Sequence, residues 1–226
     1  MNKSMSDRNS EGVRSEFSPW LTPLTYFLFC KIILPFYFNL EINGRENLPQ
    51  EGATILAPTH RSRWDPLILG YAAGWLETGR QVRSMVLEEQ TKGLQGWFLR
   101  RLGSFPVDRD RPSISTIRHS VELLQNKEML VLFPEGHIFL DNQIHPLKSG
   151  VARIGLQAAS RETELNLQVI PISIRYQYPA PPPWRCHVRV NIGSPLAMDN
   201  YRDDSVKKAG KKLTADLEMA LKELHQ

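Results

Sequence analysis

Short hydrophobic runs alternate with longer amphipathic stretches along most of the chain. Seven runs have the length and composition of buried strands: 39–43, 53–58, 82–88, 104–107, 129–133, 168–174 and 187–192. Five other stretches carry apolar residues at helical spacing: 66–77, 94–102, 113–126, 149–160 and 205–224. Strands that alternate with helices of this length predict an α/β fold, in which helices flank a central, mostly parallel or mixed sheet.

Two N-terminal segments depart from this pattern. Residues 1–17 are polar and mixed in charge, which predicts a disordered N-terminus. Residues 18–40 contain an aromatic-rich apolar run that one lysine and two prolines interrupt. These breakers argue against a straight spanning helix, so we expect helical pieces that lie in the membrane interface. The alternative is a helix that covers the core of the domain itself, which is expected to comprise residues 41–226.

Charge and cysteine content narrow the class of partner. The formal net charge is +4, a mild excess that suits anionic lipid headgroups or a phosphorylated substrate. We find no aromatic-and-basic module typical of nucleic-acid readers, so no nucleic acid is expected as a partner. Cys30 and Cys186 stand alone rather than in short paired motifs, which favours a reducing compartment. Together these features predict a protein at the cytoplasmic face of a membrane, attached peripherally or monotopically.

The stretch THRSRWDP (59–66) places His60 and Asp65 five positions apart, directly after a predicted strand. Asp65 precedes Pro66, an order typical of a helix N-cap. We expect one carboxylate oxygen to cap the helix and the other to accept a hydrogen bond from His60. That bond would fix the tautomer and leave the second ring nitrogen free to take a proton. Sites form at the carboxyl ends of strands in open α/β sheets, which makes the pair candidate catalytic residues; the alternative is a loop histidine with local hydrogen bonds alone.

The stretch GSFPVDR (103–109) runs from a short predicted strand into Arg109. The planar guanidinium of arginine matches the geometry of a phosphate, so Arg109 is a candidate phosphate ligand. The alternative is a surface ion pair with Asp108 or Asp110.

Two later stretches also follow or form predicted strands. VLFPEGHIF (131–139) runs from a buried strand into Glu135 and Gly136. Glycine there lets a ligand approach closely, and a carboxylate there binds ligand hydroxyls, buttresses an arginine or is solvated in a turn. VIPISI (169–174) contains Pro171, which predicts a bulge or a sheet edge near the site.

In this order and at these spacings, the four blocks resemble the glycerolipid acyltransferase family, best known for 1-acylglycerol-3-phosphate acyltransferases. The resemblance runs from about Leu40 to Leu196. His60 and Asp65 match its first motif and are catalytic by this resemblance. The substrate-binding positions that it implies are Gly103, Arg109, Glu135 and Gly136, and Arg111 and Lys148 are further candidate substrate-binding residues.

Two positions depart from the family pattern. Thr59 stands where an asparagine is usual, and His137-Ile138 stand where Thr-Arg is common. An arginine expected near the acceptor phosphate is therefore missing. Either the acceptor headgroup differs from a simple phosphomonoester, or one of three residues replaces that arginine: Arg111, Arg61 or Lys148.

The resemblance implies transfer of a fatty acyl group from acyl-CoA or acyl carrier protein to a lysophospholipid hydroxyl. The expected acceptor is 1-acylglycerol-3-phosphate, which would give phosphatidic acid. His60 would act as general base and Asp65 would orient it, with neither a cofactor nor a metal required. Four arginines are expected to attract anionic headgroups or carrier phosphates, unless they are merely solvated: Arg61, Arg63, Arg100 and Arg101.

Three alternatives stay open. The acceptor could be glycerol-3-phosphate or another lysolipid. The same core could serve as a non-catalytic membrane lipid-binding domain, because fold alone does not fix function. A metal-dependent hydrolase would draw its ligands from His60, Asp65, Glu135, His137 and His145, although no short metal motif such as HExxH is present.

Overall fold

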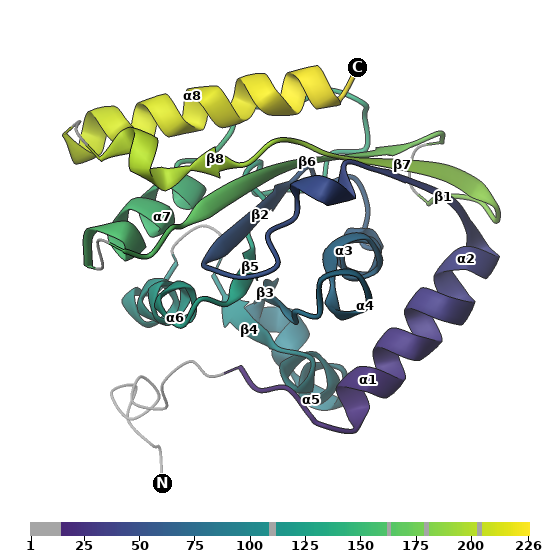
Figure 1. Cartoon of the computed structure of the whole chain (residues 1–226). Helices are drawn as coiled ribbons and strands as arrows, with labels where there is room; N and C mark the ends of the chain where they lie inside the picture. Colours follow the sequence, from purple (N-terminus) through teal and green to yellow (C-terminus); the bar gives the residue numbers. More distant parts are fainter. Residues whose placement is uncertain (1–14, 109–111, 162–163, 179–180, 203–204) are drawn as a thin grey trace, which may run out of the picture.

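The computed structural model describes residues 15–108, 112–161, 164–178, 181–202 and 205–226, and an eight-stranded sheet runs through the centre of this part (Figure 1). Its strands are β1 (Phe38–Asn43), β2 (Thr54–Pro58), β3 (Val82–Leu87), β4 (Ser104–Val107), β5 (Met129–Val131), β6 (Gln168–Tyr176), β7 (Cys186–Ile192) and β8 (Leu196–Ala197). The order is β1-β7-β6-β2-β5-β3-β4, with β8 beside β6. Neighbours are parallel except where β6 meets β7 and β8, so the sheet is mixed, as predicted.

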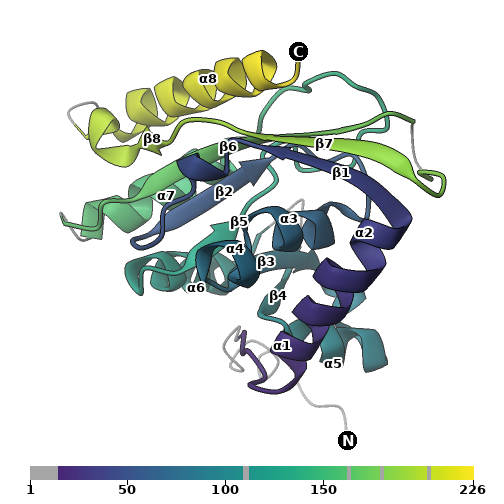
Figure 2. The same cartoon turned by 45° about the vertical axis from the view of Figure 1, so that its right-hand side comes forward.

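Helices cover both faces of the sheet (Figures 1 and 2). On one face lie α6 (Ile114–Gln125), α7 (Gly150–Arg161) and α8 (Val206–Leu224). The other face packs against α3 (Asp65–Ala73) and the N-terminal helical segment. Shorter pieces complete the chain: α4 (Trp75–Thr78), α5 (Gly93–Arg101), η3 (Arg45–Asn47), η4 (Glu88–Thr91) and η5 (Met198–Tyr201).

Side-chain alternation along the central strands builds two hydrophobic cores. In β2, Ile55 and Ala57 belong to the core beneath α6, α7 and α8, whereas Leu56 belongs to the core beneath α3. A central parallel strand is buried on both faces, which is why 53–58 reads as a continuous apolar run. The seven predicted strands are all present, whereas the two-residue strand β8 was not predicted.

The predicted helix 66–77 is two helices, divided at Gly74. Tyr26 of the N-terminal segment packs so closely there that a Cβ atom on Gly74 would lie 2.7 Å from its ring. The break therefore makes room for the N-terminal segment against the domain.

Pro171 lies in a central strand, so the predicted sheet edge is wrong, whereas the predicted bulge is present: one extra residue of the partner chain lies beside Pro171, between Ile192 and Leu196. On one side it pairs with Ala57 of β2. On the other side β6 exchanges partners: β8 pairs with it up to Val169, and β7 begins at Ile172. The Pro171 carbonyl accepts the N–H of Gly193 on that side, so the missing proline N–H faces the interval between the two partners.

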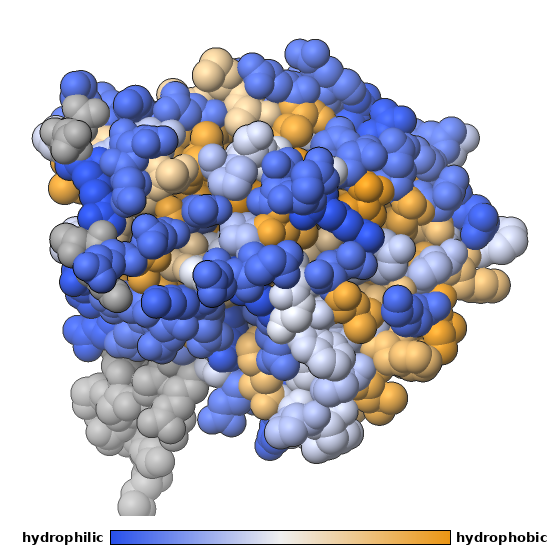
Figure 3. Space-filling model, viewed as in Figure 1, coloured by the Kyte–Doolittle hydropathy of each residue, from blue (hydrophilic) through white to orange (hydrophobic). Residues whose placement is uncertain are grey.

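The apolar segment 18–40 forms α1 (Leu21–Tyr26), a π-helical stretch η2 (Phe27–Ile33) and α2 (Leu34–Tyr37), and then enters β1. One side is buried against the domain, as in the alternative interpretation. The other side exposes Trp20, Leu24, Phe27, Leu28, Ile32 and Phe36, which we call the apolar N-terminal face. Hydrophobic surface gathers on the side of the molecule where α1 and α2 lie (Figure 3). Within the described part of the chain, no helix is both long and apolar enough to cross a membrane.

The predicted disordered N-terminus is wrong for its last three residues, and residues 1–14 lie outside the described part. Phe17 pairs with Leu102 in an isolated bridge and lies under the guanidinium of Arg83. Arg83 also donates hydrogen bonds to Ser15. These contacts hold residues 15–17 against the domain.

Candidate active site

His60 and Asp65 lie in contact just beyond the carboxyl end of β2. His60 Nδ1 is 2.8 Å from Asp65 Oδ2. A carboxylate accepts hydrogen bonds, so Nδ1 carries the proton and Nε2 is left as a proton acceptor. The His60 ring stacks on Phe133, with centroids 3.9 Å apart. The His60 side chain keeps 17% of its surface exposed, whereas that of Asp65 is fully buried.

The Asp65 carboxylate accepts hydrogen bonds from the loop before it and does not cap α3, so the predicted N-cap is wrong. Oδ2 also accepts the backbone N–H groups of Arg61 at 2.6 Å and Ser62 at 2.8 Å, and Oδ1 accepts the Tyr176 hydroxyl at 2.7 Å. Two N–H groups in the first turn of α3 bond the Trp64 carbonyl instead. A buried carboxylate needs several donors to stabilise its charge, and residues 60–62 and Tyr176 supply them here.

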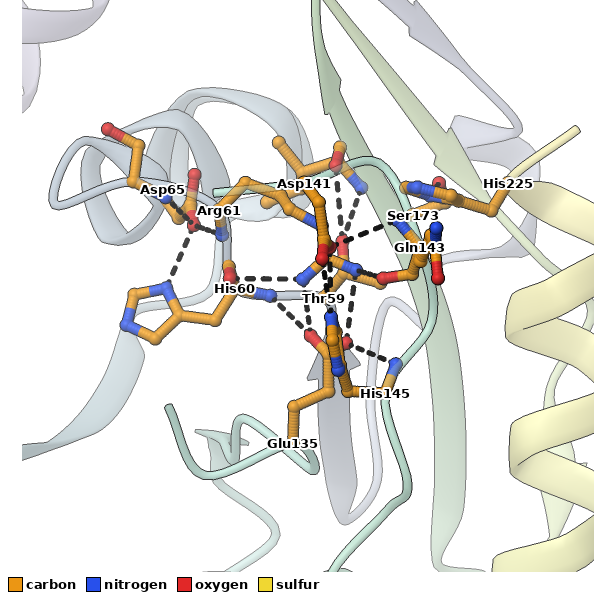
Figure 4. Close-up of polar contacts among 12 residues, drawn as sticks. Thr59, His60, Arg61, Asp65, Glu135, Asp141, Gln143, His145, Ser173 and His225 are labelled. Carbon is orange, nitrogen blue, oxygen red and sulfur yellow. Dashed lines mark hydrogen bonds and ion pairs between the residues drawn. The ribbon is translucent and has the colours of Figure 1, made fainter. Parts of the chain in front are cut away.

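A buried ion pair between Arg61 and Glu135 also holds the loop that follows β2. Arg61 donates from Nη1 to Glu135 Oε2 at 2.7 Å and from Nη2 to Oε1 at 3.0 Å. Glu135 also accepts the backbone N–H groups of His60 and His145, each at 3.0 Å. Figure 4 shows the His60 ring pointing away from this cluster. The Arg61–Glu135 pair therefore joins the loop after β2 to the loop after β5.

This pairing corrects two expectations. Arg61 is 3% exposed, so it is unable to attract headgroups or replace the missing arginine at a substrate phosphate. Glu135 is 2% exposed and uses both oxygens within the protein, so it buttresses an arginine rather than binding a substrate hydroxyl.

A cavity of about 410 Å³ opens in front of His60, at the carboxyl ends of β3, β4 and β5. Its walls are mainly hydrophobic and include Met85, Val86, Leu87, Val107, Ile117, Val131, Leu132, Phe133, Val151 and Ile154. Such a space fits an alkyl chain better than a polar ligand.

Besides His60, four basic side chains line the cavity: Arg63, His137, Lys148 and Arg153. Arg63, Lys148 and Arg153 are exposed, and none of them forms an ion pair with the described residues. Gly136 has a positive φ of 72°, and Lys148 packs across it so closely that a Cβ atom would lie 2.8 Å from the lysine chain. Gly136 thus allows Lys148 to reach the cavity.

The structure brings together His60, Asp65, Gly136 and Lys148 of the predicted site. Gly103 lies apart from them, at the amino end of β4, where its φ is 81° and Phe17 packs against it. A glycine is needed there for the turn, and nothing places it near a substrate. Arg109 and Arg111 lie outside the described residues, so their roles stay predictions.

The sequence analysis missed two residues of the site: Arg153, which lines the cavity, and Tyr176, which donates a hydrogen bond to Asp65. For Arg153, the sequence offered one indication: it lies in the first turn of the predicted helix 149–160, which begins directly after Lys148. Tyr176 lies two residues past the predicted end of its strand, and only the fold brings it to Asp65.

The proposed metal ligands do not converge. Among the residues that the structure describes, no three His, Cys, Asp or Glu side chains are grouped as a metal site requires. His145 instead pairs with Asp141, at 2.8 Å.

A protein-family model described as Acyltransferase matches residues 39–175. The chain is similar to a 1-acyl-sn-glycerol-3-phosphate acyltransferase of Bacillus subtilis, 33% identical over 134 residues, which are 57% of this chain and 64% of that protein. The protein of the same name in Streptococcus pneumoniae is 30% identical over 126 residues, 54% of this chain and 45% of that protein. The matches thus span less than two thirds of these relatives.

More distant similarities extend over more of the chain. The mitochondrial glycerol-3-phosphate acyltransferase 1 of Mus musculus is 26% identical over 175 residues, 70% of this chain and 21% of that protein. The crystal structure of the 1-acyl-sn-glycerophosphate (LPA) acyltransferase PlsC of Thermotoga maritima aligns with a TM-score of 0.65 at 19% identity. It covers 89% of this chain and 79% of that chain, which shows a shared fold.

The buried pair predicts a large stability effect. Glu135→Ala is expected to lower the free energy of unfolding by about 3–5 kcal/mol, because it leaves Arg61 buried without its counter-charge. Asp141→Ala, which removes the exposed partner of His145, serves as the control and should leave stability nearly unchanged. Urea denaturation followed by circular dichroism measures both, and equal effects would contradict the role given to Glu135.

Proposed function

The chain belongs to the acyltransferase family, and we propose from this membership that it transfers a fatty acyl group from a thioester to a hydroxyl of a phosphorylated glycerolipid. The acceptor that we propose is 1-acylglycerol-3-phosphate, which would give phosphatidic acid, and the donor is acyl-CoA or acyl-acyl carrier protein. The matches to glycerol-3-phosphate acyltransferases support glycerol-3-phosphate as the second candidate acceptor.

One observation carries the proposal: an imidazole held by a buried carboxylate lines an apolar cavity. In this geometry His60 Nε2 takes the proton of the acceptor hydroxyl as the oxygen attacks the thioester carbonyl carbon. Asp65 stabilises the imidazolium that forms. The tetrahedral intermediate then collapses, the carbon–sulfur bond breaks, and the departing thiolate receives the proton from His60.

The cavity has room for the hydrocarbon that this reaction moves. Its hydrophobic walls lie beside His60, so an acyl chain within it would place its carboxyl end near the imidazole. Hydrophobic burial of the chain supplies binding energy of roughly 0.8 kcal/mol for each methylene group. Chain length would then be limited by the depth between α6, α7 and the sheet.

The exposed cations at the cavity are proposed to bind the acceptor phosphate. Arg63, Lys148 and Arg153 all line the cavity. The two arginines offer paired donors to phosphate oxygens. Arg153 lies in the first turn of α7, where the helix dipole adds to the attraction. These residues would supply the charge of the arginine that is missing after Gly136.

The apolar N-terminal face is proposed to dock on a membrane that holds the lipid substrates. Trp20, Phe27 and Phe36 are each more than half exposed. Trp184 of the proline-rich loop lies against Phe36, with ring centroids 6.1 Å apart, and extends the surface. Aromatic side chains of this kind favour the headgroup region, while the domain itself stays outside the bilayer.

Acyl transfer and the role of His60 are tested together. Purified protein with palmitoyl-CoA or palmitoyl-acyl carrier protein should yield phosphatidic acid from 1-acylglycerol-3-phosphate. His60→Ala should lower turnover by about a hundredfold or more. His145→Ala, a histidine outside the cavity, is the control. Thiol release and lipid mass spectrometry report the outcome, and a wild-type protein that acylates neither this acceptor nor glycerol-3-phosphate would overturn the proposal.

Arg153→Ala should raise the Michaelis constant for a phosphorylated acceptor about tenfold, because one charge-assisted hydrogen bond to phosphate is lost. Turnover at saturation should change little. Arg118→Ala removes an exposed arginine of α6 that is not in the cavity wall and should have no effect. Steady-state kinetics with varied acceptor measures both constants; equal values for the two variants would remove Arg153 from the phosphate site.

Replacing Phe27 and Phe36 with glutamate should abolish binding to vesicles, because two exposed aromatic side chains become charged. These substitutions keep β1, which deletion of residues 1–40 would truncate. Ile114→Glu alters a still more exposed apolar residue on α6 and should leave binding intact. Co-sedimentation with phosphatidylglycerol–phosphatidylcholine vesicles is the measurement, and unchanged pelleting of the double variant would contradict the docking surface.

A further inference from the structure

We propose that Tyr176 is a positioning residue for the catalytic pair: its hydroxyl holds the Asp65 carboxylate and thereby sets the orientation and proton affinity of His60. The inference rests on the function proposed above, because it assigns Tyr176 a role in the same reaction.

The two oxygens of Asp65 have different surroundings. Oδ2 receives three donors, from His60 Nδ1 and the backbone N–H groups of Arg61 and Ser62. Oδ1 receives the Tyr176 hydroxyl alone among the described residues, at 2.7 Å. Asp65 is 0% exposed and Tyr176 is 5% exposed, so water cannot readily replace this bond. Tyr176 therefore determines whether Oδ1 is satisfied.

The phenol is built to donate rather than to ionise. Burial, and next the charge of Asp65, raises the pKa of Tyr176 far above its usual value. Its ring packs edge-on to Phe38, with centroids 6.2 Å apart, which limits its rotation. The hydroxyl thus stays protonated and aimed at the carboxylate over the working pH range.

Thr59 sets the register that brings Tyr176 to the site. Its N–H bonds the Ile172 carbonyl at 2.9 Å, and its hydroxyl both accepts the N–H of Ile174 at 2.9 Å and donates to the Ile174 carbonyl at 3.2 Å. These bonds extend the β2–β6 pairing one residue past Pro58. The position where this chain departs from the usual asparagine therefore holds the strand end that carries Tyr176.

A single hydrogen bond at this place affects two properties of His60. With the tyrosine present, the plane of the carboxylate is fixed, and part of its charge is neutralised. Without the tyrosine, Oδ1 would be buried with no donor, and Asp65 would hold the imidazolium more tightly. The other charged or titratable groups around the pair stay in place in a tyrosine variant: Arg61, Arg63, Glu135, His137, Lys148 and Arg153.

Tyr176→Phe keeps the ring and removes the bond. We expect kcat to fall roughly tenfold, because a hydrogen bond to a charged group is lost, while the Michaelis constants of donor and acceptor stay within about twofold. The acid limb of the pH–kcat profile should move to higher pH, since a proton on His60 is held more firmly. Tyr178→Phe, two residues on and half exposed, is the matched control and should behave as wild type.

A double variant separates positioning from packing. If Tyr176 acts through Asp65, Tyr176→Phe should cause no further loss of kcat in an Asp65→Asn background. A tenfold loss in both backgrounds, or an unmoved pH profile, would overturn the proposal. Trifluorotyrosine at position 176, a stronger donor, should move the acid limb to lower pH and keeps the test decisive if the phenylalanine variant misfolds.

A measurement without turnover distinguishes this proposal from the proposed function. The proton on His60 Nδ1 gives a nuclear magnetic resonance signal that Tyr176→Phe should shift and Tyr178→Phe should not. An unshifted signal overturns the role of Tyr176 even in an active enzyme. A shifted signal in a protein that acylates no acceptor supports the positioning bond and rejects the proposed function instead.

Discussion

The buried ion pair of Arg61 and Glu135 is the interaction on which the rest of the site depends. It joins loops that follow two adjacent strands, and its members also hold the backbone of His60, Gln143 and His145. Bringing two charges out of water is costly, and a bidentate contact with further hydrogen bonds is what makes the pair tolerable. The same bonds leave His60 little freedom in its backbone, so its ring is aimed before any ligand arrives.

The two sides of the His60 ring have different surroundings. The side of His60 toward Asp65 is dry, crowded with donors and closed, whereas the side toward the cavity is apolar and open. The general base that we propose for His60 needs both: a rigid partner that stabilises its charged form and an accessible nitrogen that would meet the substrate. Exposed cations at the same cavity add attraction for an anionic group without burying further charge.

The sheet, the helices and the His60–Asp65 contact were predictable, because periodicity and short loop length act within a few residues. Other features depend on residues far apart in the chain. Pro171 is accommodated because two different strands succeed one another beside it, and Gly103 serves a turn that Phe17 covers. Neither arrangement is encoded near the residue concerned: the proline alone left a bulge and an edge open, and the family resemblance implied a substrate contact for Gly103.

The pairing of β1 with β7 has a consequence for the order in which the protein forms. Asn43 and Asn191 bond across this pair although 148 positions separate them. A ribosome therefore releases the aromatic N-terminal helix long before the strand that locks β1 into the sheet exists. Long-range contacts of this kind close late and slow assembly. During synthesis the helix is tethered to an unfinished domain, so the membrane docking that we propose for it would begin before its orientation against the sheet is fixed.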